Sequence, residues 1–358
     1  DNAKRFVINN NDSKPLINTN SLTMMYETEY QSGEYQTSND TTWPKDGYKY
    51  NSELSKCENG STLTWDDENK KVVMQASTSD KCYVYFDVYD PIFLTDYIIN
   101  NVYTGVDGEN NLYYHDVDLA NGAEDNSYRY TGANPNNYVC FKINEGSCSE
   151  DNLYRIVGIY YNQETQEYNV KLKAEYAYEF NFYSNYQNSL LDLINNTLNN
   201  EYLTEISNIS DKISNYSWHL NEISLQLNAK QIYDTEFNNY EDNKLTQKIG
   251  LTYASDVLYA DLPNIWTNSG NYNKTLTTSN WLIVDYIKNS IGESNEALMD
   301  FSTASNDILT IYSLNGSSMI TDTDSGVSPD YAYPVFYLNS NVEYISGNGS
   351  LSNPYIIN

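Results

Sequence analysis

Apolar and polar residues alternate along four segments in the first quarter of the chain. These segments are LTMMYETEY (22–30), TLTW (62–65), KKVVMQAS (70–77) and CYVYFDVY (82–89). A period of two is typical of strands that bury one face. In the last segment that face carries Cys82, Val84, Phe86 and Val88. The pattern predicts a small β-sandwich over residues 21–90, with an Ig-like arrangement of sheets.

Residues 1–20 lack this alternation and form a polar arm with one short β-prone patch, Phe6, Val7 and Ile8. Polar chain ends fray unless something holds them. We expect the patch to add as a strand to the edge of a sheet, either in its own molecule or in a neighbouring copy.

The remainder of the chain combines aromatic strands with one helical segment. Residues 91–110 read as a linker with a short helix, in which Thr95 is a possible cap. Strand patterns then follow at 112–116, 126–130, 137–141, 152–161 and 168–178. Apolar residues recur every three or four positions from 190 to 213, as in an amphipathic helix or two shorter ones. After residue 248 the pattern returns to strands. Residues 111–358 are therefore predicted to be an α+β domain with one helical insertion.

Charge narrows the classes of partner. The 358 residues include 20 Lys and Arg against 49 Asp and Glu, which gives a net charge of −29. Nucleic acids and anionic membranes need basic surfaces, so neither is expected as a partner. The negative charge is more compatible with cations as partners, or with other copies of the chain whose repulsion is screened by cations. The sequence has no apolar run long enough to insert in a bilayer, and we expect a mature secreted chain whose targeting segment has been removed.

The four cysteines form two local pairs, Cys57 with Cys82 and Cys140 with Cys148. Neither pair has the two-residue spacing or the neighbouring histidine of a zinc site. We predict two disulfides, which imply an oxidising compartment outside the cytoplasm. The alternative is four reduced, buried thiols.

Four longer segments carry a resemblance to a known group of proteins. They lie at 112–141, 151–160, 248–260 and 334–358, and include DNSYRY, NPNNYVCF, DNLYRI and PVFYLN. They resemble an uncharacterised group of secreted or cell-surface proteins of low-GC Gram-positive bacteria, and the Cys57 to Cys82 block resembles the β domain that precedes this region in some members. The resemblance implies surface display or a fibre. A weaker similarity in element order links the C-terminal region to C-type-lectin-like and formylglycine-generating-enzyme-like folds, although Tyr333 stands where relatives usually carry Arg.

Candidate catalytic residues are scarce. His115 and His219 are the only histidines, and the cysteines are expected to be paired. Few residues are therefore available for nucleophilic catalysis by a Ser/His or Cys/His pair. His115 beside Asp116 reads as a polar pair at a strand end rather than as a general base. No enzymatic activity is predicted.

Two acidic loops are candidate calcium sites, because hard cations bind clustered oxygens on loops. The first offers Asp116, Asp118, Asn121 and Asp125, and the second offers Asp322, Asp324 and Asp330. Neither loop follows the EF-hand pattern. Solvated turns are the alternative for both.

The 37 tyrosines suggest surfaces for sugar stacking or subunit contact, although half-buried strand positions also favour tyrosine. Trp266 and Trp281 are candidate stacking residues. The leading interpretation is a structural subunit of an extracellular bacterial filament or surface layer, a homopolymer joined by donor-strand-like exchange of the arm. The alternative is a cell-surface adhesin that binds glycan or host protein through the Tyr- and Trp-rich C-terminal domain.

Overall fold

The chain divides into two compact units, Asp1–Pro91 (unit 1) and Ile92–Asn358 (unit 2). The computed structural model describes residues 7–10, 20–40, 42–66, 69–76, 79–141, 148–149, 152–179, 190–238, 244–270, 274–283, 296–303, 309–315, 318–321 and 331–358. Both units are rich in strands, as the sequence predicts.

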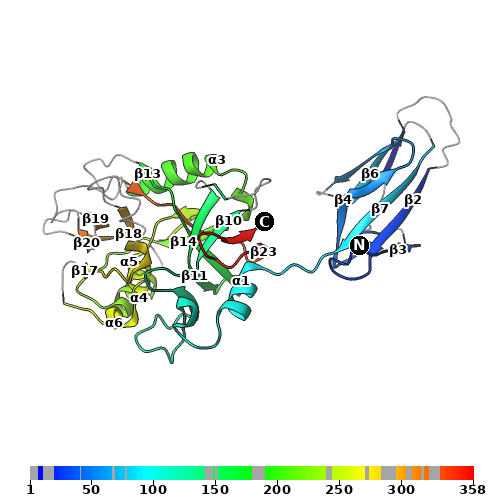
Figure 1. Ribbon diagram of the computed structural model, residues 1–358. Coiled ribbons are helices and arrows are strands. Elements are labelled where there is room, and N and C mark those ends of the chain that lie inside the picture. The colour runs from blue at the N-terminus through cyan, green and yellow to red at the C-terminus, as the bar shows by residue number, and fades with distance from the viewer. Residues whose placement is uncertain are drawn as a thin grey trace. The chain divides into compact units, whose positions relative to one another are not determined.

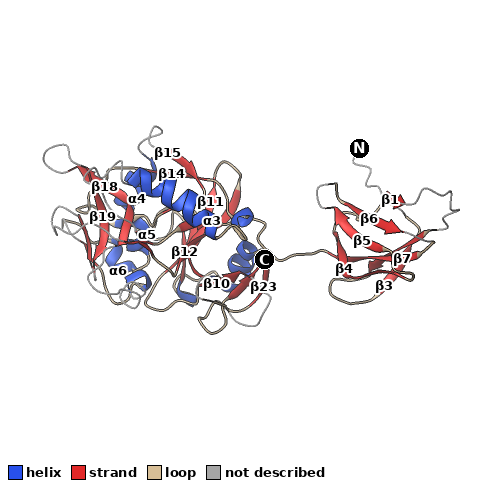
Figure 2. Cartoon of the chain, turned by 90° about the horizontal axis from the view of Figure 1, so that it is seen from above, coloured by secondary structure: helices blue, strands red, loops and turns tan. Residues whose placement is uncertain are grey.

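Unit 1 is built from two sheets that face each other, as a β-sandwich does (Figure 2). One sheet has the order β1-β6-β5 and the other β3-β2-β7-β4. The strands are β1 (Val7–Asn10), β2 (Ser21–Glu27), β3 (Tyr35–Ser38), β4 (Tyr48–Cys57), β5 (Thr62–Asp66), β6 (Lys71–Ala76) and β7 (Lys81–Val88). Two pairs are parallel, β1 with β6 and β2 with β7.

The core of unit 1 confirms the period-two interpretation of β7. Cys82, Val84 and Phe86 are at most 1% exposed, whereas the residues between them are only partly buried. Trp43 stacks on Phe86 with ring centroids 5.3 Å apart. Alternate side chains of β7 therefore face the opposite sheet, as the hydrophobic pattern requires.

Unit 2 contains a large mixed sheet and a second, smaller one. In the large sheet the order β16-β22-β12-β11-β10-β24-β23 is extended by β9, which pairs with β11 and with β8. Its strands are β8 (Leu112–His115), β9 (Ser127–Tyr130), β10 (Tyr138–Phe141), β11 (Leu153–Asn162), β12 (Glu167–Ala174), β16 (Ile249–Gly250), β22 (Val335–Tyr337), β23 (Tyr344–Ser346) and β24 (Tyr355–Ile357). Figure 1 shows β10 and β11 near the middle of this unit.

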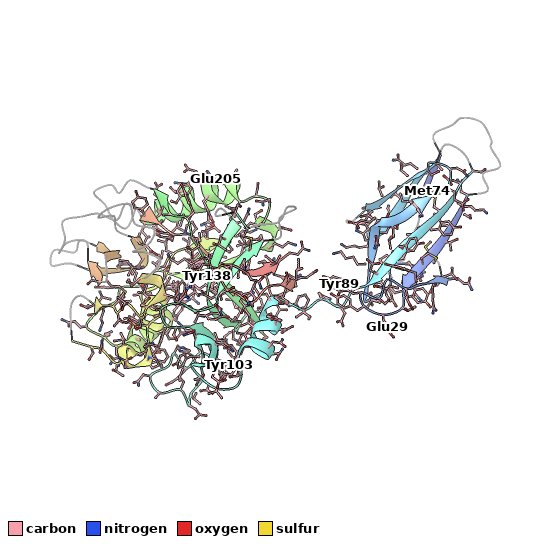
Figure 3. All side chains as sticks on the ribbon, viewed as in Figure 1. Glu29, Met74, Tyr89, Tyr103, Tyr138 and Glu205 are labelled. Carbon is pink, nitrogen blue, oxygen red and sulfur yellow. A yellow bond between two sulfur atoms is a disulfide. The ribbon has the colours of Figure 1, made fainter. Side chains whose placement is uncertain are left out.

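The second sheet of unit 2 has the order β13-β21-β18-β19-β20-β17. Its strands are β13 (Tyr178–Glu179), β17 (Lys274–Thr275), β18 (Glu296–Thr303), β19 (Leu309–Asn315), β20 (Ser318–Thr321) and β21 (Tyr331–Ala332). A separate hairpin pairs β14 (Tyr216–His219) with β15 (Lys244–Gln247). Side chains fill the interior of the unit, Tyr138 among them (Figure 3).

The helices of unit 2 are short. They are α1 (Leu94–Tyr97), η1 (Ile98–Val102), η2 (Glu109–Asn111), η4 (Leu193–Tyr202), α3 (Leu203–Glu205), η5 (Ser210–Lys212), α4 (Ala229–Asn238), α5 (Ala254–Tyr259) and α6 (Pro263–Trp266). Residues 190–205 are continuously helical, and their predicted inward face is confirmed by the burial of Leu190, Ile194, Leu198 and Tyr202.

Two local expectations differ from the structure. The helix in the predicted linker begins after Phe93, so Thr95 lies inside α1 rather than at its cap. Leu94 and Ile98 are at most 1% exposed and belong to the main core of unit 2. Residues 94–102 are therefore part of that unit and not a free connection.

The prediction of one helical insertion is also too low, because α5 and α6 lie in the region after residue 248 that was predicted to hold strands and loops, and α4 precedes that region. All six residues of α5 are buried. A helix buried on every side has no polar face and therefore no amphipathic period. Its start is set instead by a side chain, since the backbone N–H of Tyr253 donates to Oδ2 of Asp256 at 3.1 Å.

Candidate functional sites

Strand β1 is the first candidate site, because it carries part of the predicted arm. It pairs in parallel with β6 through four register positions, from Val7 opposite Val73 to Asn10 opposite Ala76. This is the pairing within a single chain that was one of the two alternatives. Phe6 lies outside the described residues.

Both predicted disulfides are present, and the alternative of reduced thiols is wrong. Cys57 and Cys82 are register partners on β4 and β7, and their bond joins two neighbouring strands of unit 1. Cys140 on β10 is bonded to Cys148 in unit 2. The bonds are consistent with an extracellular protein. Among the described residues no helix is both long and apolar enough to cross a membrane.

The first predicted calcium loop uses its carboxylates for other contacts. Oδ1 of Asp116 accepts hydrogen bonds from the backbone N–H groups of Asp118 and Leu119. Asp125 forms an ion pair with Nη2 of Arg129 at 2.6 Å. Within the described part of the chain, the Asp116, Asp118 and Asp125 carboxylates do not come together as one ligand group.

The remaining predicted calcium residues are Asn121 and the three aspartates of the second loop. Asn121 uses its backbone oxygen to accept a hydrogen bond from the hydroxyl of Tyr259 at 3.3 Å. Asp322, Asp324 and Asp330 lie outside the described residues.

Trp266 and Trp281 are core residues, which contradicts their predicted role in stacking on a ligand. Both are 0% exposed. Their indole Nε1 groups donate to the backbone oxygens of Asp261 at 2.9 Å and Tyr130 at 3.0 Å. An indole with its N–H satisfied and its rings enclosed contributes area to the core and is closed to an external sugar.

His115 is also enclosed. Its Nδ1 accepts a hydrogen bond from the backbone N–H of Ala123 at 3.0 Å, and its ring lies against Tyr259 and Trp266. Burial, reinforced by the charge of Arg129, lowers its pKa well below the ordinary value. The side chain is a neutral structural group at physiological pH.

The most unusual feature of unit 2 is a set of charged side chains inside it, which we call the ionic cluster. Its members are at most 3% exposed and come from five elements: Arg129 (β9), Lys171 (β12), Glu236 (α4), Asp256 (α5) and Asp300 (β18). Charged groups are costly to bury and need partners. Their contacts therefore define what the site can do.

Asp256 lies at the centre of the ionic cluster. Its Oδ2 accepts a hydrogen bond from Nζ of Lys171, and its Oδ1 accepts one from the hydroxyl of Tyr160 at 2.8 Å. Nη1 of Arg129 lies 3.7 Å from the same Oδ1. Burial alone would raise the pKa of Asp256, but the charges of Lys171 and Arg129 outweigh it and hold the pKa below its ordinary value.

Aromatic rings enclose the two cations. Nζ of Lys171 lies 4.8 to 5.8 Å from four ring centroids, those of Tyr253, Tyr160, Tyr337 and Trp218. The guanidinium of Arg129 lies 4.8 to 5.1 Å from the ring centroids of Tyr160, Tyr259 and Tyr233. Ring faces stabilise the cations and exclude water. Burial lowers the pKa of Lys171 despite its contact with Asp256.

The two remaining carboxyl groups contact the chain next to Asp256. Glu236 accepts hydrogen bonds from the backbone N–H of Ser255 at 2.9 Å and from its hydroxyl. Asp300 accepts one from the backbone N–H of Ala254 at 2.6 Å through Oδ2, while its Oδ1 has no hydrogen-bond partner among the described residues. Burial raises the pKa of Glu236 to about 7, and burial together with Glu236 raises that of Asp300 well above its ordinary value. Both are therefore sources of protons near neutral pH.

Comparisons with known proteins add no analogue for this arrangement. No model of a protein family, no curated protein and no solved structure matches the chain. Function must therefore be argued from the geometry of β1 and of the ionic cluster.

The sequence of β12 carries a signal for this cluster. Lys171 and Lys173 interrupt a strand whose residues from Asn169 to Ala174 are all buried. A lysine at an inward position of a strand requires a partner. That reasoning identifies a buried ion pair, but it does not say which acid supplies it.

The raised pKa of Glu236 predicts how the stability of unit 2 varies with pH. The unfolded group titrates at about 4.5 and the folded one at about 7, so its contribution is complete below pH 4.5 and is lost as the pH rises through 7. We expect the free energy of unfolding to fall by up to about 1 kcal/mol between pH 6.5 and 8. Urea unfolding at both pH values measures this change.

Glu236→Gln serves as the control for that experiment. The variant retains His115, which is neutral in the folded state. This histidine therefore makes the folded protein more stable as the pH rises, which is the opposite of the effect of Glu236. Subtracting the two proteins removes the histidine contribution. A wild-type slope no steeper than that of the variant would show that Glu236 does not hold a proton in the folded state.

Proposed function

We propose that the protein is a structural subunit of an extracellular filament or surface layer, in which β1 of one copy pairs with β6 of another. The observation that carries the proposal is the parallel pairing of β1 with β6. Every backbone hydrogen bond of that pairing is available in the same form to the β1 of a second copy. Exchange would thus replace one contact by an equivalent one.

The sheet gains from the presence of β1, whichever copy supplies it. Without β1, the sheet is reduced to the β5–β6 hairpin, and a two-stranded hairpin is only marginally stable. An open edge on β6 also invites pairing with other chains. Ten residues separate Asn10 from Ser21, and such a segment spans roughly 35 Å when extended, so β1 can leave while β2 stays paired with β7.

Exchange of this kind is a heterologous contact, which produces an open filament unless the rotation closes a ring. In the proposal, unit 1 is the Ig-like module that provides the edge strand, and the chain is secreted. No catalytic turnover is involved. Because each copy carries a net charge of −29, cations such as calcium are expected to promote assembly by screening repulsion.

The adhesin alternative no longer has the two tryptophans as its binding residues, since both are buried. Its remaining candidates are the tyrosines of the C-terminal domain, of which Tyr176 is 67% exposed. It remains a defined outcome of the assembly experiment, which separates a polymer from a monomer that binds ligands.

Electron microscopy of the intact chain beside a variant that lacks residues 1–12 tests the proposal. We expect filaments or ordered layers from the intact chain, promoted by calcium or by added salt, and none from the variant. Monodisperse particles from both proteins in every condition would reject the fibre subunit and favour the adhesin.

A cysteine pair across β1 and β6 distinguishes pairing within a chain from pairing between chains. Asn9 and Gln75 are register partners, and Gln75 is exposed. Mixing Asn9→Cys with a size-tagged Gln75→Cys under oxidising conditions is expected to give a heterodimer of mixed size. Each single variant alone is the control. A double variant that carries both cysteines in one chain completes the set. If only this double variant forms a disulfide across β1 and β6, and it remains a monomer, β1 does not exchange.

A further inference from the structure

We propose that Lys171 and Asp256 become joined by an amide bond, so that unit 2 carries an intramolecular cross-link between β12 and α5. The proposal is independent of arm exchange, because every residue involved lies in unit 2. It assigns the ionic cluster a chemical role as a self-processing site.

The reacting groups already meet the geometric requirement. Nζ of Lys171 is in hydrogen-bond contact with Oδ2 of Asp256, and both side chains are at most 2% exposed. Holding two reactants in contact replaces a bimolecular encounter by a unimolecular step, with effective concentrations of about 10⁵ M or more for well-oriented pairs. A β-strand and a buried helix, rather than loops, fix this pair in place.

The surroundings favour the neutral amine that amide formation requires. Ring faces of Tyr160, Tyr253, Tyr337 and Trp218 surround the amine. Desolvation disfavours the ion pair relative to a neutral amine and carboxylic acid, and one proton transfer from Nζ to the carboxylate interconverts the two. The lowered pKa of Lys171 acts in the same direction. The charge of Arg129 opposes it by favouring the carboxylate.

The same Arg129 assists once the reaction begins. Attack of the neutral Nζ on Cγ of Asp256 places negative charge on a carboxyl oxygen. The Tyr160 hydroxyl donates to Oδ1, and the Arg129 guanidinium lies 3.7 Å from that atom. Donors aimed at a developing oxyanion stabilise the transition state more than the ground state.

Proton transfer completes the reaction, and Glu236 and Asp300 are the groups placed to relay it. They bind the backbone of Ser255 and Ala254, the two residues directly before Asp256. A protonated carboxyl can give its proton to the leaving hydroxyl and regain one from the attacking nitrogen. The net change is amine plus carboxylic acid to amide plus water, with no oxidation or reduction.

Lys173 and Glu296 provide a matched comparison within the same strand. Lys173 lies two residues after Lys171 and is buried against Glu296, with Nζ 3.3 Å from a carboxylate oxygen. Its ammonium also lies 3.7 Å from the ring centroid of Tyr333. A cross-link specific to Lys171 must therefore survive Lys173→Arg.

Mass spectrometry of the intact, denatured wild-type protein is the decisive experiment. We expect a mass lower than the calculated one by one water, about 18 Da, in addition to the four hydrogens lost in the two disulfides. After reduction and trypsin digestion, a branched peptide should join the Lys171 and Asp256 segments. A folded wild-type protein of full mass, or a deficit that maps to other residues, would overturn the proposal.

Substitutions in the ionic cluster then test which residues form the cross-link and which transfer protons. Lys171→Met is expected to restore the full mass, and Lys173→Arg to retain the deficit. Asp256→Asn is expected to release ammonia instead of water and to give a linked product of the same mass as the wild type. Glu236→Gln should fold and show only partial conversion. Complete conversion in Glu236→Gln and in a variant that also carries Asp300→Asn would remove these two residues from the mechanism.

Discussion

Replacing Arg129 by alanine is expected to destabilise unit 2 by about 3–5 kcal/mol, which is the usual cost of removing one partner of a buried ion pair. Arg129 is 2% exposed and contacts both Asp125 at 2.6 Å and Asp256 at 3.7 Å. Its loss removes the ion-pair partner of Asp125 and one of the two cations beside Asp256, and it leaves three tyrosine rings around an empty volume. Urea unfolding followed by far-ultraviolet circular dichroism measures the loss.

A partly exposed ion pair on the same unit provides the control. Lys230 and Asp234 lie one turn apart on α4, 2.7 Å from each other, and both are partly exposed to solvent. Lys230→Ala is expected to cost less than about 1 kcal/mol, because water already screens that pair. If the two substitutions cost the same, the ionic cluster does not stabilise unit 2.

Removing the Cys57–Cys82 disulfide is the second prediction with a large effect. Cys57→Ser with Cys82→Ser opens a loop between residues 25 positions apart, and the chain-entropy relation gives a loss of about 3.5 kcal/mol in unit 1. Cys82 is also 1% exposed, so the new hydroxyls add a desolvation cost. The unfolding transition of unit 1 should move to lower urea while that of unit 2 stays in place.

The corresponding pair in unit 2 tests the selectivity of that result. Cys140 and Cys148 are only eight positions apart, so the same relation gives a smaller loss, about 2.5 kcal/mol. Cys140→Ser with Cys148→Ser should move only the transition of unit 2. Equal shifts of both transitions by either double variant would mean that the two units do not unfold independently.

Parts of the fold could be predicted from the sequence because they depend on near neighbours along the chain. The alternation in β7 and the three-to-four spacing from Leu190 to Tyr202 are repeated within single elements, and both predict the buried face correctly. The cysteine spacing likewise predicted both disulfides. In each case the pattern reports which side of one element meets water.

The same reasoning failed for residues buried on all sides. Helix α5 shows no period because no face of it is exposed. Trp266 and Trp281 look like surface residues in Asn- and Ser-rich segments, yet the backbone oxygens that satisfy them come from Asp261 and from Tyr130 on a separate strand. Whether an aromatic residue stacks on a ligand or fills a core depends on what packs over it, which local sequence does not contain.

The sequence by itself determined the strand-rich composition, the two disulfides, the negative charge and a short β-prone patch near the start of the described chain. Only the tertiary structure decided that this patch can pair with β6, and that Lys171 meets Asp256 beside Glu236 and Asp300. Those four side chains come from β12, α4, α5 and β18. Their meeting depends on contacts between elements far apart in the chain, and periodicity within one element carries no information about such contacts.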